Sequence, residues 1–400
     1  RGAGFARTIS EFPHLGRIVA VAEPRPEYRE RIATDYQLAA DHVFETWQDF
    51  VRAGKICDAV VIATMDQDHV GPAVKCTELG YDMLLEKPMA VTLEDCRAIA
   101  EAQSQAGTVT TVCHSLRYNK GFAKLKEIAA SGRLGRLVTL DQIEQVSWWH
   151  QAHSFVRGNW GNESRSTFML LAKSCHDIDY IAYLLDEPCT SVASYGALTY
   201  FTPENAPENS GERCVDCAVE PECPYSAIRQ YVQTDRERWP AAAIAADHSQ
   251  QSHYDAIATG PYGQCVWKTD NDVVDHQVVM MQFERDITAT FTMTAFTQRG
   301  GRKIRLHGTK ADALFQEGTI EVREFDSNNT ETIEIGAESG GHGGGDKRVV
   351  LNWLRAMHNE DPGFVVTDVH ESLRTHSIVF AAEKARRENR MVDMQEVYEG

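Results

Sequence analysis

The first third of the chain alternates short apolar runs with stretches of helical periodicity. Four runs that are continuously apolar at their centres predict buried parallel strands, over 17–23, 58–64, 81–86 and 108–113. Between the third and fourth, Thr92 and Asp95 have the pattern of a capping box at a helix start. Strands that alternate with helices predict βαβ units, so we expect a parallel, doubly wound α/β sheet over residues 1–114.

After about His114 the pattern changes to long strand-like runs that follow one another closely. We predict strands over 137–146, 191–200, 273–284, 287–296 and 303–314, with turn signals between several of them. Helices are expected at about 165–185, 346–359 and 369–389. Residues 115–400 are therefore interpreted as an α+β domain with a large, mostly antiparallel open sheet. A polar, irregular segment at about 202–262 contains cysteines and is interpreted as an insertion.

The composition narrows the classes of partner. With 40 basic and 58 acidic residues, the net charge is -18, which argues against non-specific nucleic-acid binding. No apolar stretch approaches the length of a transmembrane helix, so we expect no membrane span. Most of the ten cysteines are dispersed through apparent core segments and are interpreted as reduced, which favours a cytoplasmic location.

The first residues carry part of a dinucleotide-binding pattern. A Rossmann fingerprint needs glycines after the first strand and an acidic residue about 20 positions later. Gly2 and Glu23 have this spacing, so we interpret Gly2 as the last glycine of the fingerprint, with the first strand and the start of the loop missing. Glu23 would accept hydrogen bonds from the adenosine ribose and repel a 2′-phosphate, which favours NAD over NADP. Arg25 nearby weakens that preference.

An ordered set of short motifs resembles the Gfo/Idh/MocA family of NAD(P)-dependent oxidoreductases. The motifs cover nearly the whole chain and are Ala22-Glu23-Pro24, Ala63-Thr64 with His69, Glu86-Lys87-Pro88, Arg117-Tyr118-Asn119, Gly132-Arg133-Leu134-Gly135 and Cys175-His176-Asp177-Ile178-Asp179. The resemblance implies a Rossmann domain, then an α+β domain whose open sheet supports a homo-oligomer, a dimer or tetramer. It also implies a substrate site between the nicotinamide and the second domain.

The resemblance assigns roles to several residues. Lys87, at the end of a predicted strand, and His176, on a helix of the second domain, would flank the reacting carbon. The cofactor would contact Thr64, His69, Glu86 and Lys87, and the substrate would contact Arg117 and Tyr118. Lys87 can stabilise a developing alkoxide, and His176 can take its proton, since the pKa of a histidine is ordinarily roughly 6.5. A histidine satisfied within the core is the alternative for His176.

One departure from the family pattern concerns the residue before this histidine. Many members have an aspartate four positions earlier, where this chain has Ala172 with Lys173 beside it. Lys173 and His176 are three residues apart, so on one helix they would face the same site. We infer that Lys173 replaces the acidic partner and binds a substrate hydroxyl or an anionic group.

Two further segments have sugar-binding character. The glycine-rich run 340–346 contains His342 and Asp346, which could bind sugar hydroxyls, although a simple linker is as good an interpretation. A similar glycine-histidine loop occurs in the NAD-dependent glycosidase branches of the family. A second set of aromatic and basic residues crowds the start of the second domain and suits either a sugar ring or interface packing: Trp148, Trp149, His150, His153, Arg157 and Trp160.

The cysteines of the insertion have zinc-like spacing. Cys214, Cys217 and Cys223 cluster, and Cys265 is the best fourth ligand for a structural zinc that would hold this polar segment together. Reduced, unliganded cysteines or a disulfide are the alternatives.

The sequence as a whole predicts an NAD-dependent enzyme. It would transfer hydride between the nicotinamide and a secondary alcohol of a sugar, cyclitol or glycoside. The alternative is a glycosidase that uses NAD to oxidise the ring transiently, eliminates the aglycone, adds water and reduces the ring again.

Overall fold

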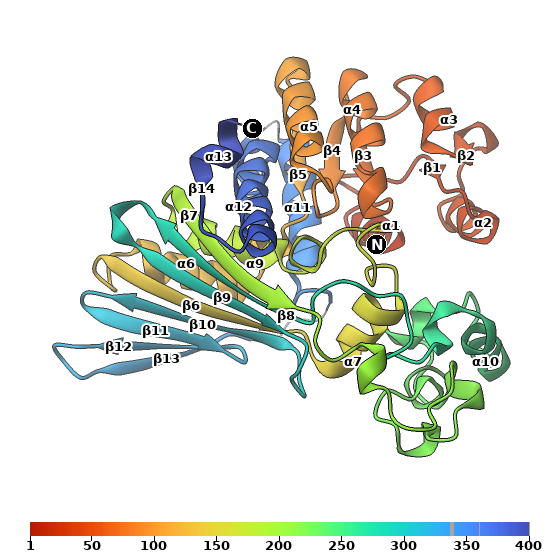
Figure 1. Ribbon diagram of the computed structural model, residues 1–400. Coiled ribbons are helices and arrows are strands. Elements are labelled where there is room, and N and C mark those ends of the chain that lie inside the picture. Colours follow the sequence, from red (N-terminus) through yellow and green to blue (C-terminus); the bar gives the residue numbers. More distant parts are fainter. Residues whose placement is uncertain (337–339, 360, 400) are drawn as a thin grey trace.

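Three sheets organise residues 1–336, 340–359 and 361–399, which the computed structural model describes (Figure 1). The N-terminal part has two parallel sheets, ordered β1-β2 and β3-β4-β5. Their strands are β1 (Val21–Ala22), β2 (Val43–Phe44), β3 (Ala59–Ile62), β4 (Asp82–Leu85) and β5 (Thr110–Val112). The helices are α1 (Gly2–Ser10), α2 (Pro26–Asp35), α3 (Trp47–Arg52), α4 (Val70–Glu78) and α5 (Leu93–Ala106).

The predicted βαβ units of this part are confirmed, with one strand much shorter than expected. Only Val21 and Ala22 of the run 17–23 pair with a neighbouring strand. The capping prediction holds at α5, where the Thr92 hydroxyl accepts from the backbone N–H of Asp95 at 3.1 Å. β4 is central in its sheet and completely buried from Met83 to Leu85, which sets the residues that follow it at the carboxyl edge.

The second part is built on a nine-stranded mixed sheet. Its order is β13-β12-β11-β10-β6-β9-β8-β7-β14, and only the β6–β9 pair is parallel. The strands are β6 (Leu137–Gln145), β7 (Cys189–Ala197), β8 (His276–Phe283), β9 (Thr288–Thr294), β10 (Gly301–Gly308), β11 (Ala311–Gln316), β12 (Thr319–Glu324), β13 (Thr330–Glu334) and β14 (Val392–Asp393). The expected single strand over 303–314 is thus wrong, because the chain bends at Thr309 and Lys310 and returns as a hairpin.

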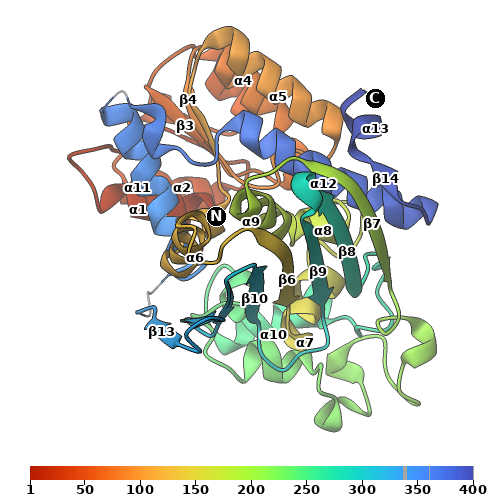
Figure 2. The ribbon, with the colours of Figure 1, turned by 90° about the vertical axis from the view of Figure 1, so that its left-hand side faces the viewer.

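Helices cover one face of this sheet and separate it from the parallel strands (Figure 2). The helices of this part of the chain are α6 (Lys120–Ala130), α7 (Trp148–His150), α8 (Met169–Ala172), α9 (Cys175–Leu185), α10 (Gln250–Thr259), α11 (Gly345–His358), α12 (Val369–Glu388) and α13 (Met394–Glu399). Of these, α10 lies in the insertion and α11 packs on α1 and β4. The helix expected at about 165–185 is divided into α8 and α9. None of the helices among the described residues is long and apolar enough to span a membrane.

α11 lies far along the sequence but packs against the first part of the chain. Val349, Val350 and Trp353 of α11 share a buried apolar cluster with Phe5 of α1 and Leu84 of β4. The insertion, in contrast, forms one small apolar cluster of its own, shares a second with residues 152 and 156, and projects beside α7 (Figure 1).

Candidate active site

Lys87 lies where the two parts of the molecule meet. It follows β4 by two residues, and its Nζ donates to the carbonyl oxygen of Ala172 at the end of α8, at 2.6 Å. The preceding Glu86 is buried; it accepts from the backbone N–H of Lys87 at 2.8 Å and pairs with Arg1. The strand end therefore presents one ammonium group toward the second domain, as the sequence predicts.

His176 is buried in the first turn of α9 and has no hydrogen-bond partner at either ring nitrogen among the described residues. Its ring centroid lies 4.9 Å from that of His342 and 5.7 Å from that of His114. Burial lowers the pKa of His176 well below its ordinary value, and the nearby His342 and Lys87 lower it further. The imidazole is therefore neutral and has two unused polar atoms.

His342 and Asp346 form an ordered pair beside His176. His342 Nδ1 lies 2.8 Å from Asp346 Oδ1, and Arg1 donates to the other carboxylate oxygen at 2.7 Å. Although burial favours the neutral acid, hydrogen bonds from His342 and Arg1 hold the pKa of Asp346 well below its ordinary value. Asp346 therefore carries a charge that keeps a proton on Nδ1 of His342 and leaves Nε2 as the unpaired nitrogen.

The glycine-rich loop allows this close packing. A side chain at position 345 would overlap the carbonyl oxygen of Ser115, so only glycine fits where α11 starts. Gly343 and Gly344 both have positive φ, at 58° and 82°. The described part of this loop is therefore more than a linker, because its shape brings His342 over His176.

Lys173 occupies a different position from the one expected. It lies in the break between α8 and α9, so it does not share a helix face with His176, and the one-turn argument from the sequence is wrong. Its Nζ lies 2.9 Å from a carboxylate oxygen of Glu144 on β6. The helix breaks at this point, and the lysine side chain points to the sheet, where an acidic partner neutralises it.

Glu144 continues into a buried charge network. Arg302 on β10 lies 3.0 Å from Glu144 and makes two contacts with Asp177, at 2.6 and 3.0 Å. Asp177 also accepts from Gln142 at 2.6 Å. Burial raises the pKa of Asp177, while Arg302 opposes that rise. The sequence analysis missed Glu144 and Arg302, although Leu140, Gln142 and Glu144 alternate along the inner face of β6.

Two other buried histidines escaped the sequence analysis. His114 follows β5 and has no hydrogen-bond partner at either ring nitrogen within the described residues, although its Nδ1 lies 3.8 Å from a carboxylate oxygen of Asp179. Burial lowers its pKa to about 3. His376 of α12 accepts from the backbone N–H of Met89 and is held by the carbonyl oxygen of Ser372. Their rings lie 5.3 Å apart, next to His176. No sequence motif marks either residue.

Arg117 and Tyr118, predicted to contact substrate, are buried and already engaged. Arg117 makes a bidentate pair with Asp179, at 2.7 and 2.8 Å, and a further contact with Glu371. The Tyr118 hydroxyl lies 3.1 Å from that of Thr367. These contacts tie α9 and α12 to the end of the first domain, which is a structural role.

Two of the residues predicted to hold the nucleotide lie at the ends of elements in the first part, at the start of α1 and directly after β1. Gly2 is the first residue of α1, and no side chain caps this N-terminus, which leaves first-turn amides for a phosphate. Glu23 follows β1, but Arg25 donates to both of its carboxylate oxygens, at 2.7 and 2.9 Å, and lowers its pKa. An adenosine ribose bound at Glu23 would have to compete with Arg25 for the carboxylate.

Thr64 and His69 shape the loop after β3. The Thr64 hydroxyl donates to the carbonyl oxygen of Asp68 at 3.0 Å. The two ring nitrogens of His69 lie 2.7 Å from the carbonyl oxygen of Pro88 and 3.3 Å from that of Thr64. His69 thus connects this loop to the residue after Lys87, and its side chain is buried rather than directed to a ligand.

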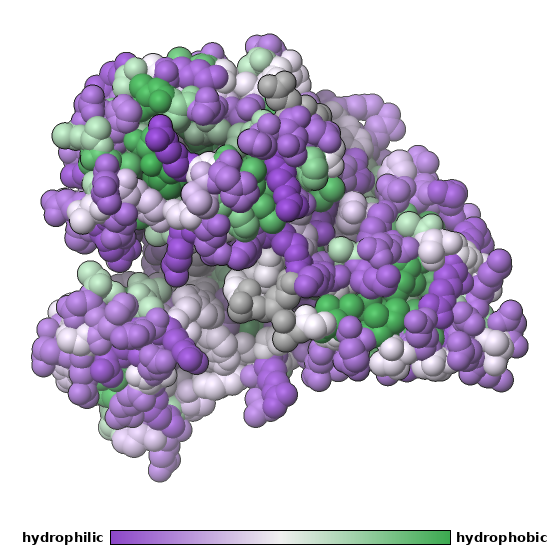
Figure 3. Space-filling model, turned by 180° about the vertical axis from the view of Figure 1, so that it is seen from behind, coloured by the Kyte–Doolittle hydropathy of each residue, from purple (hydrophilic) through white to green (hydrophobic). Residues whose placement is uncertain are grey.

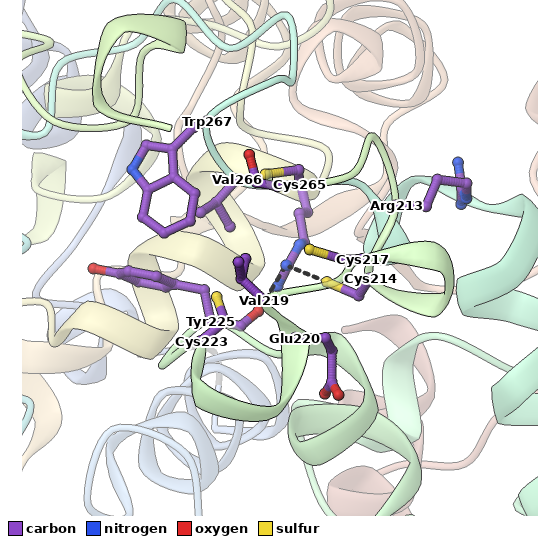
Figure 4. A pocket seen from close by; sticks show the side chains of 12 residues that line it. Arg213, Cys214, Cys217, Val219, Glu220, Cys223, Tyr225, Cys265, Val266 and Trp267 are labelled. Atoms are coloured by element: carbon purple, nitrogen blue, oxygen red, sulfur yellow. Dashed lines mark hydrogen bonds between the residues drawn. The ribbon is translucent and has the colours of Figure 1, made fainter. Parts of the chain in front are cut away.

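The predicted zinc site is not supported. Four cysteines line one small cavity beside Val219 and Tyr225, namely Cys214, Cys217, Cys223 and Cys265 (Figure 4). Yet no group of three His, Cys, Asp or Glu side chains anywhere in the described residues could hold a metal ion. The reason is local: Cys214 Sγ already accepts from Arg157 and from the backbone N–H of Ala227, both at 3.4 Å, so protein donors occupy this sulfur. The cysteines are free, without disulfides.

Comparison with known proteins identifies the family. The profile described as an oxidoreductase family with an NAD-binding Rossmann fold matches residues 2–114, and that of its C-terminal alpha/beta domain matches residues 126–394. The chain belongs to the Gfo/Idh/MocA family. Its first part is thus an NAD-binding Rossmann domain, and the predictions of the family, the fold and an NAD(P)-dependent dehydrogenase are confirmed.

Individual relatives of this Gfo/Idh/MocA protein are distant. YteT of Bacillus subtilis (strain 168) is 27% identical over 361 residues, 86% of this chain and 77% of YteT. An inositol 2-dehydrogenase of Serratia proteamaculans (strain 568) is 28% identical over 193 residues, 48% of this chain and about half (53%) of the relative. A levoglucosan dehydrogenase solved with NADH and L-sorbose is 16% identical, with a TM-score of 0.71 over 98% of this chain and 95% of that one.

Proposed function

We propose that the protein transfers hydride between a secondary alcohol of a sugar, cyclitol or glycoside and the nicotinamide of NAD. The observation that carries the proposal is His176, a buried imidazole without a partner among the described residues. Because an unpaired buried polar group costs free energy, a substrate hydroxyl is its natural partner. Relatives named inositol and levoglucosan dehydrogenases support this substrate class.

Bound NAD would accept the hydride from the carbinol carbon; this chain's residues handle the proton and the charge. Lys87, whose Nζ now donates to the carbonyl of Ala172, would donate to the developing alkoxide and stabilise it. His176 is neutral and would accept the hydroxyl proton. His342, in ring contact with His176 and ordered by Asp346, would bind a second hydroxyl or take the proton onward.

Lys173 would orient the substrate in this proposal. Its side chain is 17% exposed and is held by Glu144 on the sheet side of the site. A lysine and a carboxylate together can donate to and accept from neighbouring hydroxyls, as a ring with several hydroxyl groups requires. The homo-oligomer and the cytoplasmic location stay predictions.

The glycosidase is the second candidate, and the His342–Asp346 pair favours it. Elimination of an aglycone requires removal of a carbon-bound proton in addition to the hydroxyl proton, and the site offers two histidines in contact. The two functions differ in cofactor use. A dehydrogenase accumulates NADH in step with product, whereas the glycosidase releases aglycone without net NADH.

The experiment is a screen of sugars, cyclitols and aryl glycosides with NAD, read by both nicotinamide absorbance and aglycone release. Lys87→Ala and His176→Ala should each lower turnover by ~10²–10⁴-fold while NAD affinity is kept. Lys124→Ala is the control, since Lys124 pairs with Glu127 on the surface of α6. Normal turnover by both variants would exclude the assigned roles.

A further inference from the structure

A cluster of aromatic rings lies where the insertion meets the second domain. β6 ends at Gln145, and α7, which carries Trp149 and His150, follows almost directly. The next helical segment, η4 (Gln151–Arg157), adds His153. The insertion contributes Trp239 from the far side of the cluster. Residues far apart in the sequence thus build one surface.

Trp239 is the exposed member of this cluster. Its ring centroid lies 4.9 Å from that of His150, 5.2 Å from that of His153 and 5.4 Å from that of Trp149. The interplanar angles of 83°, 90° and 61° are typical of edge-to-face packing. Trp239 nevertheless keeps 51% of its surface exposed, so three rings hold it while about half of the indole faces solvent.

The aromatic cluster of Trp149, His150, His153 and Trp239 is held in place by contacts between the insertion and the rest of the second domain. Gln230 of the insertion donates to the carbonyl oxygen of Trp149 at 3.1 Å, and the hydroxyl of Tyr231 lies 3.0 Å from Nδ1 of His153. His153 also stacks on Tyr262, with the centroids 5.0 Å apart at an angle of 17°. A surface that is held before the ligand arrives loses little freedom on binding, which favours affinity.

The cluster adjoins the proposed active site. Glu144, which holds Lys173, lies at the end of β6 from which α7 continues. Burial lowers the pKa of His150 to about 2, and the charge of Lys173 lowers it further. Figure 3 shows a hollow between the Rossmann domain and the insertion, on the side where these elements meet.

We propose that Trp239, with Trp149 and His150, forms a second subsite that holds a further sugar ring of the substrate, next to the ring that is oxidised. A pyranose has an apolar face that packs on an indole, and a polar edge that suits the neutral imidazole of His150. Trp239 is the exposed ring of this set, and the half-buried Trp149 and His150 hold it in place for such a stacking contact. The substrate would then be a disaccharide or longer glycoside. This inference rests on the proposed function only for the identity of the first ring.

Binding without turnover tests the subsite. Wild-type protein with NADH is titrated calorimetrically with disaccharides, aryl glycosides and the parent monosaccharides. Trp239→Ala should weaken disaccharide binding about threefold to tenfold, the effect of losing one aromatic stacking contact, and leave monosaccharide binding unchanged. Trp239→Phe should restore most of the affinity. Phe325→Ala, which removes another exposed aromatic ring, should change neither.

Each other outcome has a distinct meaning. If Trp239→Ala weakens the binding of disaccharides and monosaccharides equally, Trp239 lies at the first ring. If it weakens neither, or changes only the oligomeric state, the cluster is an interface. Each of these three results overturns the subsite. Disaccharide binding that depends on Trp239 without any oxidation or aglycone release supports the subsite and rejects the proposed function. If only aryl glycosides depend on Trp239, the aromatic cluster takes an aglycone, and the second sugar ring is rejected. If no saccharide in the panel binds, both proposals fail.

Discussion

Replacement of Arg302 by methionine should destabilise the second domain strongly and in a pH-dependent way. Arg302 is the one described cation that contacts both Glu144 and Asp177, whose side chains are 3% and 0% exposed. Methionine fills a similar volume but carries no charge, so both buried carboxylates lose their contact with the guanidinium. Breaking a buried pair typically costs ~3–5 kcal/mol, which for a large domain corresponds to roughly 6–20 °C in melting temperature.

The pH dependence follows from Asp177. Its pKa is already raised by burial, and without Arg302 it should rise further. A carboxyl with a higher pKa in the folded protein than in the unfolded chain destabilises the fold increasingly as pH rises from its unfolded to its folded pKa. The loss caused by Arg302→Met should therefore be larger at pH 7 than at pH 5.

Differential scanning fluorimetry at both pH values provides the measurement. Arg323→Met is the matched control, because Arg323 pairs with Glu321 on an exposed part of β12, where such a pair contributes about 0–1 kcal/mol. Adding Asp177→Asn to Arg302→Met should recover part of the lost stability at pH 7. Equal melting temperatures for the two arginine variants, or a loss that does not change between pH 5 and pH 7, would refute the reasoning.

Three other changes test the site. Glu23→Ala should reduce the preference for NAD over NADP, measured as the ratio of the two dissociation constants, because the carboxylate that repels a 2′-phosphate is gone; an unchanged ratio contradicts this role. Lys173→Ala should mainly raise KM in steady-state kinetics, and a loss of kcat as large as that of His176→Ala would place Lys173 in the proton chemistry. Asp346→Asn should lower kcat by about 10²-fold, since His342 loses the charge that orients it, while NAD affinity measured by calorimetry stays the same.

The sequence reveals the position of Lys87 because a local pattern determines it. An apolar run followed by Glu86-Lys87-Pro88 predicts a buried strand with a polar residue at its end, and β4 has that arrangement. Glu144 could also have been found, since polar residues at alternate positions of β6 fall on the inner face beside Leu140. Buried polar groups need partners, so the pattern calls for a cation such as Arg302.

Other features depend on contacts that no local pattern records. The strand pattern runs across Thr309 and Lys310, so it predicts one strand where the structure has the hairpin of β10 and β11. Gly308 is the available turn signal, and a side chain there would overlap the carbonyl oxygen of Leu134. Lys173 and Glu144 meet only because the fold brings the break before α9 to β6, against which α9 packs. The cysteines have zinc-like spacing, and only the fold shows Arg157 in contact with Cys214.

The packing of α11 has a consequence for how the protein is made. Its Val349, Val350 and Trp353 complete a core that includes Phe5 and Leu84, which leave the ribosome much earlier. The NAD-binding part therefore exposes an apolar surface throughout the synthesis of the second domain. Contacts between such distant segments slow folding and lengthen the time during which that surface can aggregate. A chain that stops after the Rossmann strands would keep the surface uncovered, so the nucleotide domain matures only after the residues of α11 have been made.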